Sequence, residues 1–284
     1  SGTWDVTGGT WTAGRDNASY ANPAFFVNAG TLKLSSGNPL GQNGRMTVIA
    51  SGATVQLAGG SYGTSHTLLD GGTISGSNNF NTDIYGIYAT SGTISTGSAN
   101  TVYTGMWKVG AGTLTISGGF TGGNSYGNTS GGLNLYEGTV TLNGANGALN
   151  YSTANCELRL LGGTLQLDNT GTNNNNRLAN AASGRFVVRG GELDVRSHAS
   201  TALAETAAPL ALLGGGAISL TASGNVNGSV LAFNGALTRS SQGTALVRGR
   251  NLGDSLAANV AQVTFGTPAT LSNAGSGTTQ GILP

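Results

Sequence analysis

The chain has 284 residues, of which 50 are glycine, and charged residues make up only 8% of it. A typical soluble domain is about 25% charged and about 7% glycine, so this composition argues against most ordinary enzymes. The 12 Lys and Arg residues and the 11 Asp and Glu residues leave a net charge of +1, and the cations are scattered, which argues against binding to nucleic acid or to a membrane surface. No stretch approaches the roughly 18 apolar residues of a membrane span, so this segment is not expected to insert into a membrane.

A short phrase recurs along the chain: a glycine, then Thr or Ala, then apolar and polar residues in alternation. Successive copies are 19 to 28 residues apart. The alternation predicts a strand with one buried face, and the glycine supplies the positive φ that a sharp corner needs. The copies begin at Gly9, Gly30, Gly52, Gly72, Gly92, Gly112, Gly138, Gly163, Gly191, Gly216 and Gly235.

Other short apolar runs lie between these copies, for example residues 46–49, 133–136, 158–160, 186–188 and 230–233. Two or three short strands in each repeat form one turn of a β-solenoid, in which equivalent strands stack in parallel about 4.8 Å apart. Eleven such turns would give a rod roughly 50 Å long. A sandwich or barrel with hairpins every 8–12 residues is the competing all-β fold, and the steady spacing argues against it.

We therefore predict one continuous all-β domain over residues 1–284, a single-stranded right-handed parallel β-solenoid with about 20–28 residues per turn. The handedness follows the general preference of parallel connections. Loop insertions are expected near 122–132, 169–176 and 198–210. The last of these includes an Ala-rich stretch that Pro209 interrupts, and it is expected as a short helix or as a protruding loop.

Two phrases of the repeat resemble the autotransporter-associated β-strand repeat of bacterial surface proteins. They are residues 109–118, with the sequence VGAGTLTISG, and residues 135–142, with the sequence LYEGTVTL. Residues 163–167 and 281–284 extend the resemblance, which is closest from Trp107 to Pro284. It implies a parallel β-helix displayed on, or released from, the surface of a bacterium with an outer membrane. It implies no catalytic residues, since the motif encodes a fold element.

The best candidate for catalysis is an acid pair, because glycoside hydrolysis needs two nearby carboxylates. Glu192 and Asp194 are two residues apart on one predicted strand, so they share its solvent face. Arg189 and Arg196 flank the pair and Arg185 is near in sequence, so the group is either a catalytic cluster or a solvated face with balanced charges. The second interpretation is favoured, because a catalytic groove needs a denser cluster of ionisable groups.

The other ionisable groups give little support for chemistry. His66 and His198 are expected at the surface, and neither lies in a catalytic phrase. Asp83 with Asn78, Asn79 and Asn81 offers oxygens to calcium, but this composition is more typical of turns. No zinc spacing and no phosphate-binding loop is present in the sequence, so no metal site and no cofactor are expected.

Aromatic residues gather in one region of the chain, and this region is the candidate binding site. Tyr85, Tyr88, Tyr103 and Trp107 either stack against sugars or form a ladder that stabilises the rod. The ladder is the favoured interpretation.

The sequence thus predicts a non-enzymatic extracellular rod: a surface passenger, an adhesin stalk or a fibre subunit built by end-to-end stacking. Its expected partners are copies of itself or the rest of a longer solenoid, with surface glycans as a further possibility. The alternative is a polysaccharide-binding or polysaccharide-cleaving β-helix surface protein.

Overall fold

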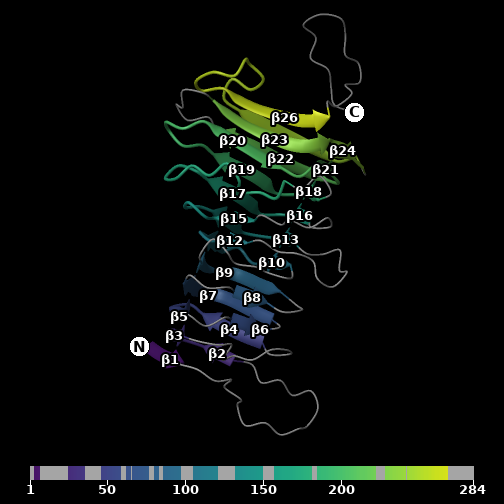
Figure 1. Ribbon diagram of the computed structural model, residues 1–284. Coiled ribbons are helices and arrows are strands. Elements are labelled where there is room, and N and C mark those ends of the chain that lie inside the picture. Colours follow the sequence, from purple (N-terminus) through teal and green to yellow (C-terminus); the bar gives the residue numbers. More distant parts are fainter. Residues whose placement is uncertain are drawn as a thin grey trace, which may run out of the picture.

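The computed structural model describes residues 3–6, 25–35, 46–58, 62–64, 66–76, 80–82, 86–96, 105–120, 132–149, 157–180, 184–221, 228–240 and 242–267. Within these ranges the regular elements are all strands, and every strand pairing is parallel. Nineteen strands form one large sheet that curves nearly closed around an axis, an architecture consistent with a β-solenoid-like parallel fold. Figure 1 shows the strands stacked from the N-terminal to the C-terminal end of the molecule.

The strands of the large sheet form two stacks, and β7 (His66–Gly76) and β9 (Ile87–Thr96) are long enough to take part in both. The other strands of the first stack are β2 (Phe25–Val27), β4 (Met46–Ala50), β10 (Met106–Lys108), β13 (Gly132–Leu135), β16 (Glu157–Leu160), β18 (Arg185–Val188), β21 (Leu210–Leu212) and β24 (Thr238–Arg239). The other strands of the second stack are β1 (Thr3–Val6), β3 (Gly30–Leu34), β5 (Ala53–Leu57), β11 (Thr113–Ile116), β14 (Thr139–Leu142), β17 (Thr164–Asp168), β19 (Glu192–Arg196), β22 (Gly215–Thr221) and β25 (Thr244–Gly249).

Shorter parallel ladders, separate from the large sheet, form a third side of the stacked structure. They pair β6 (Tyr62–Thr64) with β8 (Phe80–Thr82), β12 (Gly119–Phe120) with β15 (Ala148–Leu149), and β20 (Leu203–Ala207) with β23 (Ser229–Ala236) and β26 (Ala261–Thr267).

The core is a set of columns that run along the stacks, as the alternation predicts. In the second stack, paired residues place one apolar side chain above the next, and each of them is almost completely buried. Burying a side chain of this size contributes about 1.5–3 kcal/mol, and β-branched and Leu side chains pack well on a pleated surface. The column consists of Leu32, Val55, Ile74, Ile94, Ile116, Leu142, Leu167, Val195 and Leu220.

Three copies of the recurring phrase are not paired as their sequence alignment predicts. The copy at Gly52 is offset by one residue, since Gly30 pairs with Ala53 and Thr54 pairs with Thr73. Gly92 pairs with Leu114, not with Gly112, because β9 runs straight from the first stack into the second. In the next layer residues 109–112 form a corner between β10 and β11, and this longer connection shifts the register by two residues.

The last copy of the recurring phrase, which begins at Gly235, is also not paired as the alignment predicts. Gly235 lies in β23, on the third side, and Gly216 pairs instead with Ala245 of β25.

The expected insertion at 198–210 is corrected by the structure. Leu203–Ala207 is β20 and Leu210–Leu212 is β21, so the Ala-rich stretch supplies strands to the third side and to the first stack. Burial of Leu203, Ala207 and Leu210 overrides the low strand propensity of alanine. The segment 169–176 is an irregular loop, as expected. The expected insertion at 122–132 falls outside the described residues except for Gly132, which begins β13.

Candidate functional site

Two of the four predicted aromatic residues, Tyr88 and Trp107, lie side by side in the structure. Tyr88 pairs in register with Trp107 on the outer face of the first stack, with ring centroids 5.0 Å apart and ring planes 13° from parallel. The ring of His66 stacks on the other side of Tyr88, at 6.3 Å and 22°. Tyr88 is 37% exposed. Tyr85 and Tyr103 lie outside the described residues.

The stack of His66, Tyr88 and Trp107 has the geometry of a ladder. Aromatic rings that grip a sugar present a face to it, whereas here both faces of the Tyr88 ring are turned toward neighbouring rings. Beyond Trp107 the next residue in register is Asn134, which is only 4% exposed. The rings therefore offer mainly their edges, and the role of Tyr88 and Trp107 in sugar binding stays a prediction.

The predicted acid pair lies on the outer face of the second stack, and both side chains are half-buried. Each carboxylate accepts hydrogen bonds from neighbouring strands. The Ser219 hydroxyl donates to Oε1 of Glu192 at 2.5 Å, and Gln166 Nε2 donates to Oδ2 of Asp194 at 3.1 Å. Arg196 Nε lies 2.9 Å from the same Asp194 oxygen. The contacts to Ser219 and Gln166 join β19 to its two neighbouring strands, β22 and β17, whereas the contact to Arg196 lies within β19.

Arg185, which is near the acid pair in sequence, lies on a different face. It belongs to β18 of the first stack, where its Nε donates to Oε1 of Glu157 at 2.6 Å. Arg159 holds the other oxygen of Glu157 at 2.6 Å and also donates to Asn134 at 3.3 Å. Glu157, Arg159 and Arg185 thus form an ion cluster across the paired strands β16 and β18, and the hydrogen bond to Asn134 links it to β13. The sequence does not reveal the cluster, because Arg185 is 28 residues from Glu157.

Lys108 is a charged residue inside the core that the sequence analysis misses. It occupies a core column of the first stack between Ala89 and Leu135, and its side chain is fully buried. Its Nζ donates to the backbone carbonyls of Val109, Gly110 and Glu137 at 3.0, 2.5 and 3.2 Å. Burial lowers the pKa of Lys108, and the nearby Glu137 carboxylate opposes this shift. The alternation of Met106, Trp107 and Lys108 is the signal that places Lys108 inward.

Arg177 organises the Asn-rich loop 169–176 and is fully buried. Its Nε donates to Oδ1 of Asn169 at 2.8 Å, and its two terminal nitrogens donate to four backbone carbonyls. The carbonyls belong to Gly144, Gly147, Asp168 and Thr172, at 2.7 to 3.1 Å. Because each of the three guanidinium nitrogens donates to protein oxygens, Arg177 links the loop to the neighbouring layer.

Glu205 completes this buried network from β20. Its carboxylate accepts the backbone N–H groups of Arg177 at 3.1 Å and of Leu178 at 2.9 Å, in the position where a strand would otherwise pair. Burial raises the pKa of Glu205 to about 7, although the two N–H groups and the charge of Arg177 act in the opposite direction. Sequence reasoning misses Glu205 because its partners are 27 and 28 residues away.

The remaining candidates show no site within the described part of the chain. Nδ1 of His198 accepts the backbone N–H of Ser200 at 3.2 Å, and burial lowers the pKa of His66. No group of three or more His, Cys, Asp or Glu residues that could hold a metal ion occurs among the described residues. Asp83, Asn78 and Asn79 lie outside them. A search of the described ranges also finds no helix of sufficient length and apolar character to cross a membrane.

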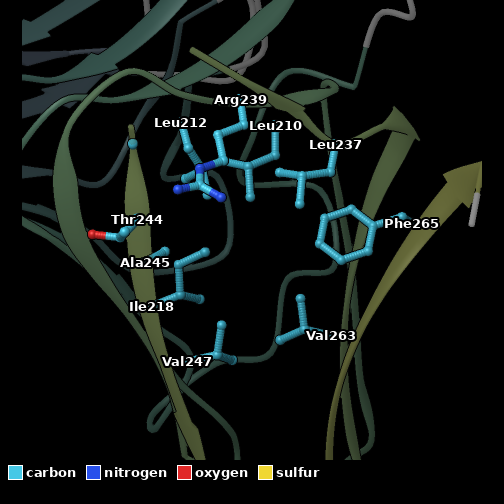
Figure 2. A pocket seen from close by; sticks show the side chains of 11 residues that line it. Leu210, Leu212, Ile218, Leu237, Arg239, Thr244, Ala245, Val247, Val263 and Phe265 are labelled. Atoms are coloured by element: carbon cyan, nitrogen blue, oxygen red, sulfur yellow. The ribbon is translucent and has the colours of Figure 1, made fainter. Parts of the chain in front are cut away.

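An apolar cavity of about 310 Å³ opens at the C-terminal end of the described stack. Figure 2 shows Leu210, Leu212, Leu237 and Arg239 on one side, Val247 on a second, and Val263 and Phe265 on a third. These residues are the last members of the core columns: Leu212 pairs with Arg239, Ile218 with Val247, and Phe233 with Phe265. The cavity is therefore the end of the core, with its three walls formed by the three sides of the stack.

The chain shows no significant match to any protein-family model, to any curated protein or to any solved structure. The architecture and the contacts of the described residues are therefore the basis for the proposed function.

Proposed function

We propose that this chain is a segment of a non-enzymatic extracellular structural rod, built as a single-stranded right-handed parallel β-solenoid with about 20–28 residues per turn. The observation that carries the proposal is the continuity of the second stack, in which ten consecutive pairings join eleven strands from β1 to β25. A stack of this kind gains length and stability by adding turns, as a spacer or stalk requires.

The burial and the hydrogen bonds of the ionisable groups support a structural role. Lys108, Arg177 and Glu205 are buried and bonded mainly to backbone groups. Glu192 and Asp194 are engaged by side chains of adjacent strands. Catalysis requires groups that can reach a substrate and change their protonation, whereas these groups fasten successive layers to one another.

The position of the rod in the cell rests on the resemblance to the autotransporter-associated repeat. On that ground we place it outside the cell or at the surface of a bacterium with an outer membrane, as a passenger, an adhesin stalk or a fibre subunit. Its partners in this proposal are further turns of the same fold, from the rest of a longer solenoid or from other copies of the chain. No cofactor takes part.

A polysaccharide assay separates this proposal from the enzymatic alternative. The purified chain and the double variant Glu192→Ala/Asp194→Ala are incubated with a panel of neutral and acidic polysaccharides, and the release of reducing ends is measured. We expect no release from either protein, and a folded double variant with a lower melting temperature, because it loses the hydrogen bonds from Ser219 and Gln166. Release by the unmodified chain that disappears in a folded double variant would contradict the structural function.

A further inference from the structure

An asparagine followed by glycine is the pair at which a protein chain most readily modifies itself, because glycine has no side chain to hinder the attack of its backbone nitrogen on the asparagine. Three such pairs lie within the described residues and begin at Asn143, Asn146 and Asn234, and two more begin outside them, at Asn43 and Asn227. The structure gives the three described pairs different surroundings, and these surroundings decide which pair reacts in the folded protein.

Asn146 is the pair with the most freedom. It ends the turn formed by residues 144–146, between β14 and β15, and its side chain is exposed. Its side-chain amide makes no hydrogen bond to another group in the described part of the chain. Within the same ranges, the backbone nitrogen of Gly147 donates to no backbone carbonyl. Both reacting groups are therefore free of the hydrogen bonds that a strand ladder imposes.

The stack restrains the other two described pairs. Asn143 is half-buried, and its backbone N–H donates to the carbonyl of Ile116 at 3.0 Å. Asn234 lies within β23, and its Nδ2, the nitrogen that deamidation would expel, donates to the carbonyl of Asn180 at 2.9 Å. Ring closure needs a compact conformation of the two residues, so Asn234 has to leave its extended strand before it can react.

The packing of the layers requires the glycine that makes Asn146 reactive. A Cβ added to Gly147 would lie 2.0 Å from the carbonyl oxygen of Asn143 and 2.5 Å from that of Ile116. Real Cβ atoms do not approach backbone oxygens so closely, so another residue at position 147 would displace the chain. The close approach of the neighbouring layer thus fixes glycine directly after Asn146.

The turn that contains Asn146 is held by the next layer of the stack. The carbonyls of Gly144 and Gly147 accept hydrogen bonds from the two terminal nitrogens of Arg177, at 3.0 and 2.7 Å. The carbonyl of Ala145 accepts one from Nδ2 of Asn174 at 3.1 Å. A change in the length of the turn backbone would therefore disturb hydrogen bonds that join two layers.

We propose that Asn146 is a site of self-modification, at which the folded protein ages by deamidation. The backbone nitrogen of Gly147 forms a bond to Cγ of Asn146, the bond from Cγ to Nδ2 breaks, and the proton of the Gly147 N–H leaves with the amide nitrogen as ammonia. Water then opens the resulting cyclic imide at one of its two carbonyls, which gives aspartate or isoaspartate and releases a proton to the solvent.

Isoaspartate is the product that alters the structure. Its main chain runs through Cβ, so the turn gains one backbone atom between Gly144 and Gly147, and these two carbonyls no longer both fit the guanidinium of Arg177. The link between the two layers is weakened at this point. The inference goes beyond the proposed function, because it depends only on the turn and on the residues that hold it.

Peptide mapping by mass spectrometry during incubation at mildly alkaline pH tests the site. The purified 284-residue chain is incubated folded and, in parallel, unfolded in urea, and the loss of the amide is followed at each Asn-Gly pair. In the folded chain Asn146 is expected to react at least about tenfold faster than Asn234, because Asn234 must first leave its strand. In urea the two rates are expected to be similar, since both asparagines precede glycine.

The stability of the aged protein tests the consequence. Deamidated chains are separated by their added negative charge, and the fraction with isoaspartate at position 146 is identified by electron-transfer dissociation. Its melting temperature is expected to lie below that of Asn146→Asp, which has the same charge and a main chain of normal length. Asn146→Ser changes only an exposed side chain of the turn and cannot react, so it is the matched control and is expected to keep its melting temperature during incubation.

Three results would overturn the inference. Equal rates at Asn146 and Asn234 in the folded chain would show that the turn does not favour the reaction. The same ratio of rates in the folded and the unfolded chain would show that local sequence, and not the structure, selects the site. An isoaspartate fraction that melts together with Asn146→Asp would show that the turn does not hold the two layers together. All three results are separate from the elongated shape on which the proposed function depends.

Discussion

Lys108 and Gly138 occupy complementary positions at the corner between the two stacks. Nζ of Lys108 fills the space beside Gly138, so that a Cβ added to this glycine would lie 2.7 Å from the nitrogen. Gly138 also has φ +70°, in the left-handed region that disfavours other residues. One glycine therefore permits both a sharp turn and a buried ammonium group that ties together two successive layers.

Gly138→Ala is expected to destabilise the protein by at least about 2 kcal/mol, because it combines an unfavourable φ with a clash against Lys108 and two carbonyl oxygens. The free energy of unfolding in urea measures the effect. Gly171→Ala is the matched control, since a Cβ there meets nothing within 4 Å and its φ is not in the left-handed region. Equal stability of the two variants would show that Lys108 does not occupy this corner.

Arg177→Lys is expected to cost about 3 kcal/mol although it conserves the charge. A lysine has three donors on one nitrogen, whereas Arg177 reaches five oxygens at separate positions around the loop. The same substitution at exposed Arg189 is expected to change stability by no more than about 0.5 kcal/mol. Thermal and urea unfolding of both variants check the difference, and a mild effect at both positions would contradict the buried network.

The pH dependence of stability tests Glu205. Its folded-state pKa of about 7 lies above the ordinary value of 4.5, so between these values the folded protein retains a proton that the unfolded chain has lost. This group's contribution therefore falls as the pH rises from about 4.5 to about 7, by up to about 3 kcal/mol, and is constant above that. Glu205→Gln cannot titrate, and its side-chain oxygen can satisfy only one of the two N–H groups well.

The measurement for Glu205 is the melting temperature of both proteins from pH 4.5 to pH 8. We expect the unmodified protein to exceed Glu205→Gln by more at pH 5 than at pH 8, because only the unmodified protein loses the proton. Other titrating groups contribute equally to the two profiles and cancel in the difference. Parallel profiles across this range would show that Glu205 is ionised throughout.

Leu114→Asp and Thr113→Asp compare the two faces of one strand. Leu114 is fully buried in the core and Thr113 is exposed on the outer face. We expect Leu114→Asp to destabilise by more than about 4 kcal/mol, since it places an unpaired charge in the core, and Thr113→Asp by about 0.5 kcal/mol or less. Circular dichroism with urea unfolding checks both values, and a reversed order would contradict the register of β11.

Much of the fold can be predicted from the sequence because solenoid contacts repeat. Each Gly-Thr phrase carries its own corner and its own alternation, so residues such as Leu165 and Val140 can be assigned to the core from local pattern alone. The pairing register of neighbouring strands cannot be predicted in this way. The phrase at Gly92 and the phrase at Gly112 look alike in sequence, but the corners before them differ in length. Strand β20 is missed for a related reason: burial against a neighbouring layer decides its conformation, and the neighbour is a full turn away in sequence.

The candidate site is less predictable than the fold. Tyr88 and Trp107 are singled out by composition, and their stacking is a consequence of a register that only the structure provides. Lys108, Arg177 and Glu205 each reach partners 27 to 30 residues away, and no local motif marks such contacts. The few charges in this chain are informative because the composition is otherwise so neutral, and several of them turn out to join one layer to the next.

Small-angle X-ray scattering from the monomeric chain, supported by electron microscopy of the same preparation, tests the central claim most directly. Eleven strands about 4.8 Å apart in the second stack predict an elongated particle with a stacked length of about 50 Å and a constant cross-section. Scattering of this form, with rods in the micrographs, is the expected result. A compact particle of equal dimensions in all directions would contradict the stacked parallel fold and the structural function proposed from it.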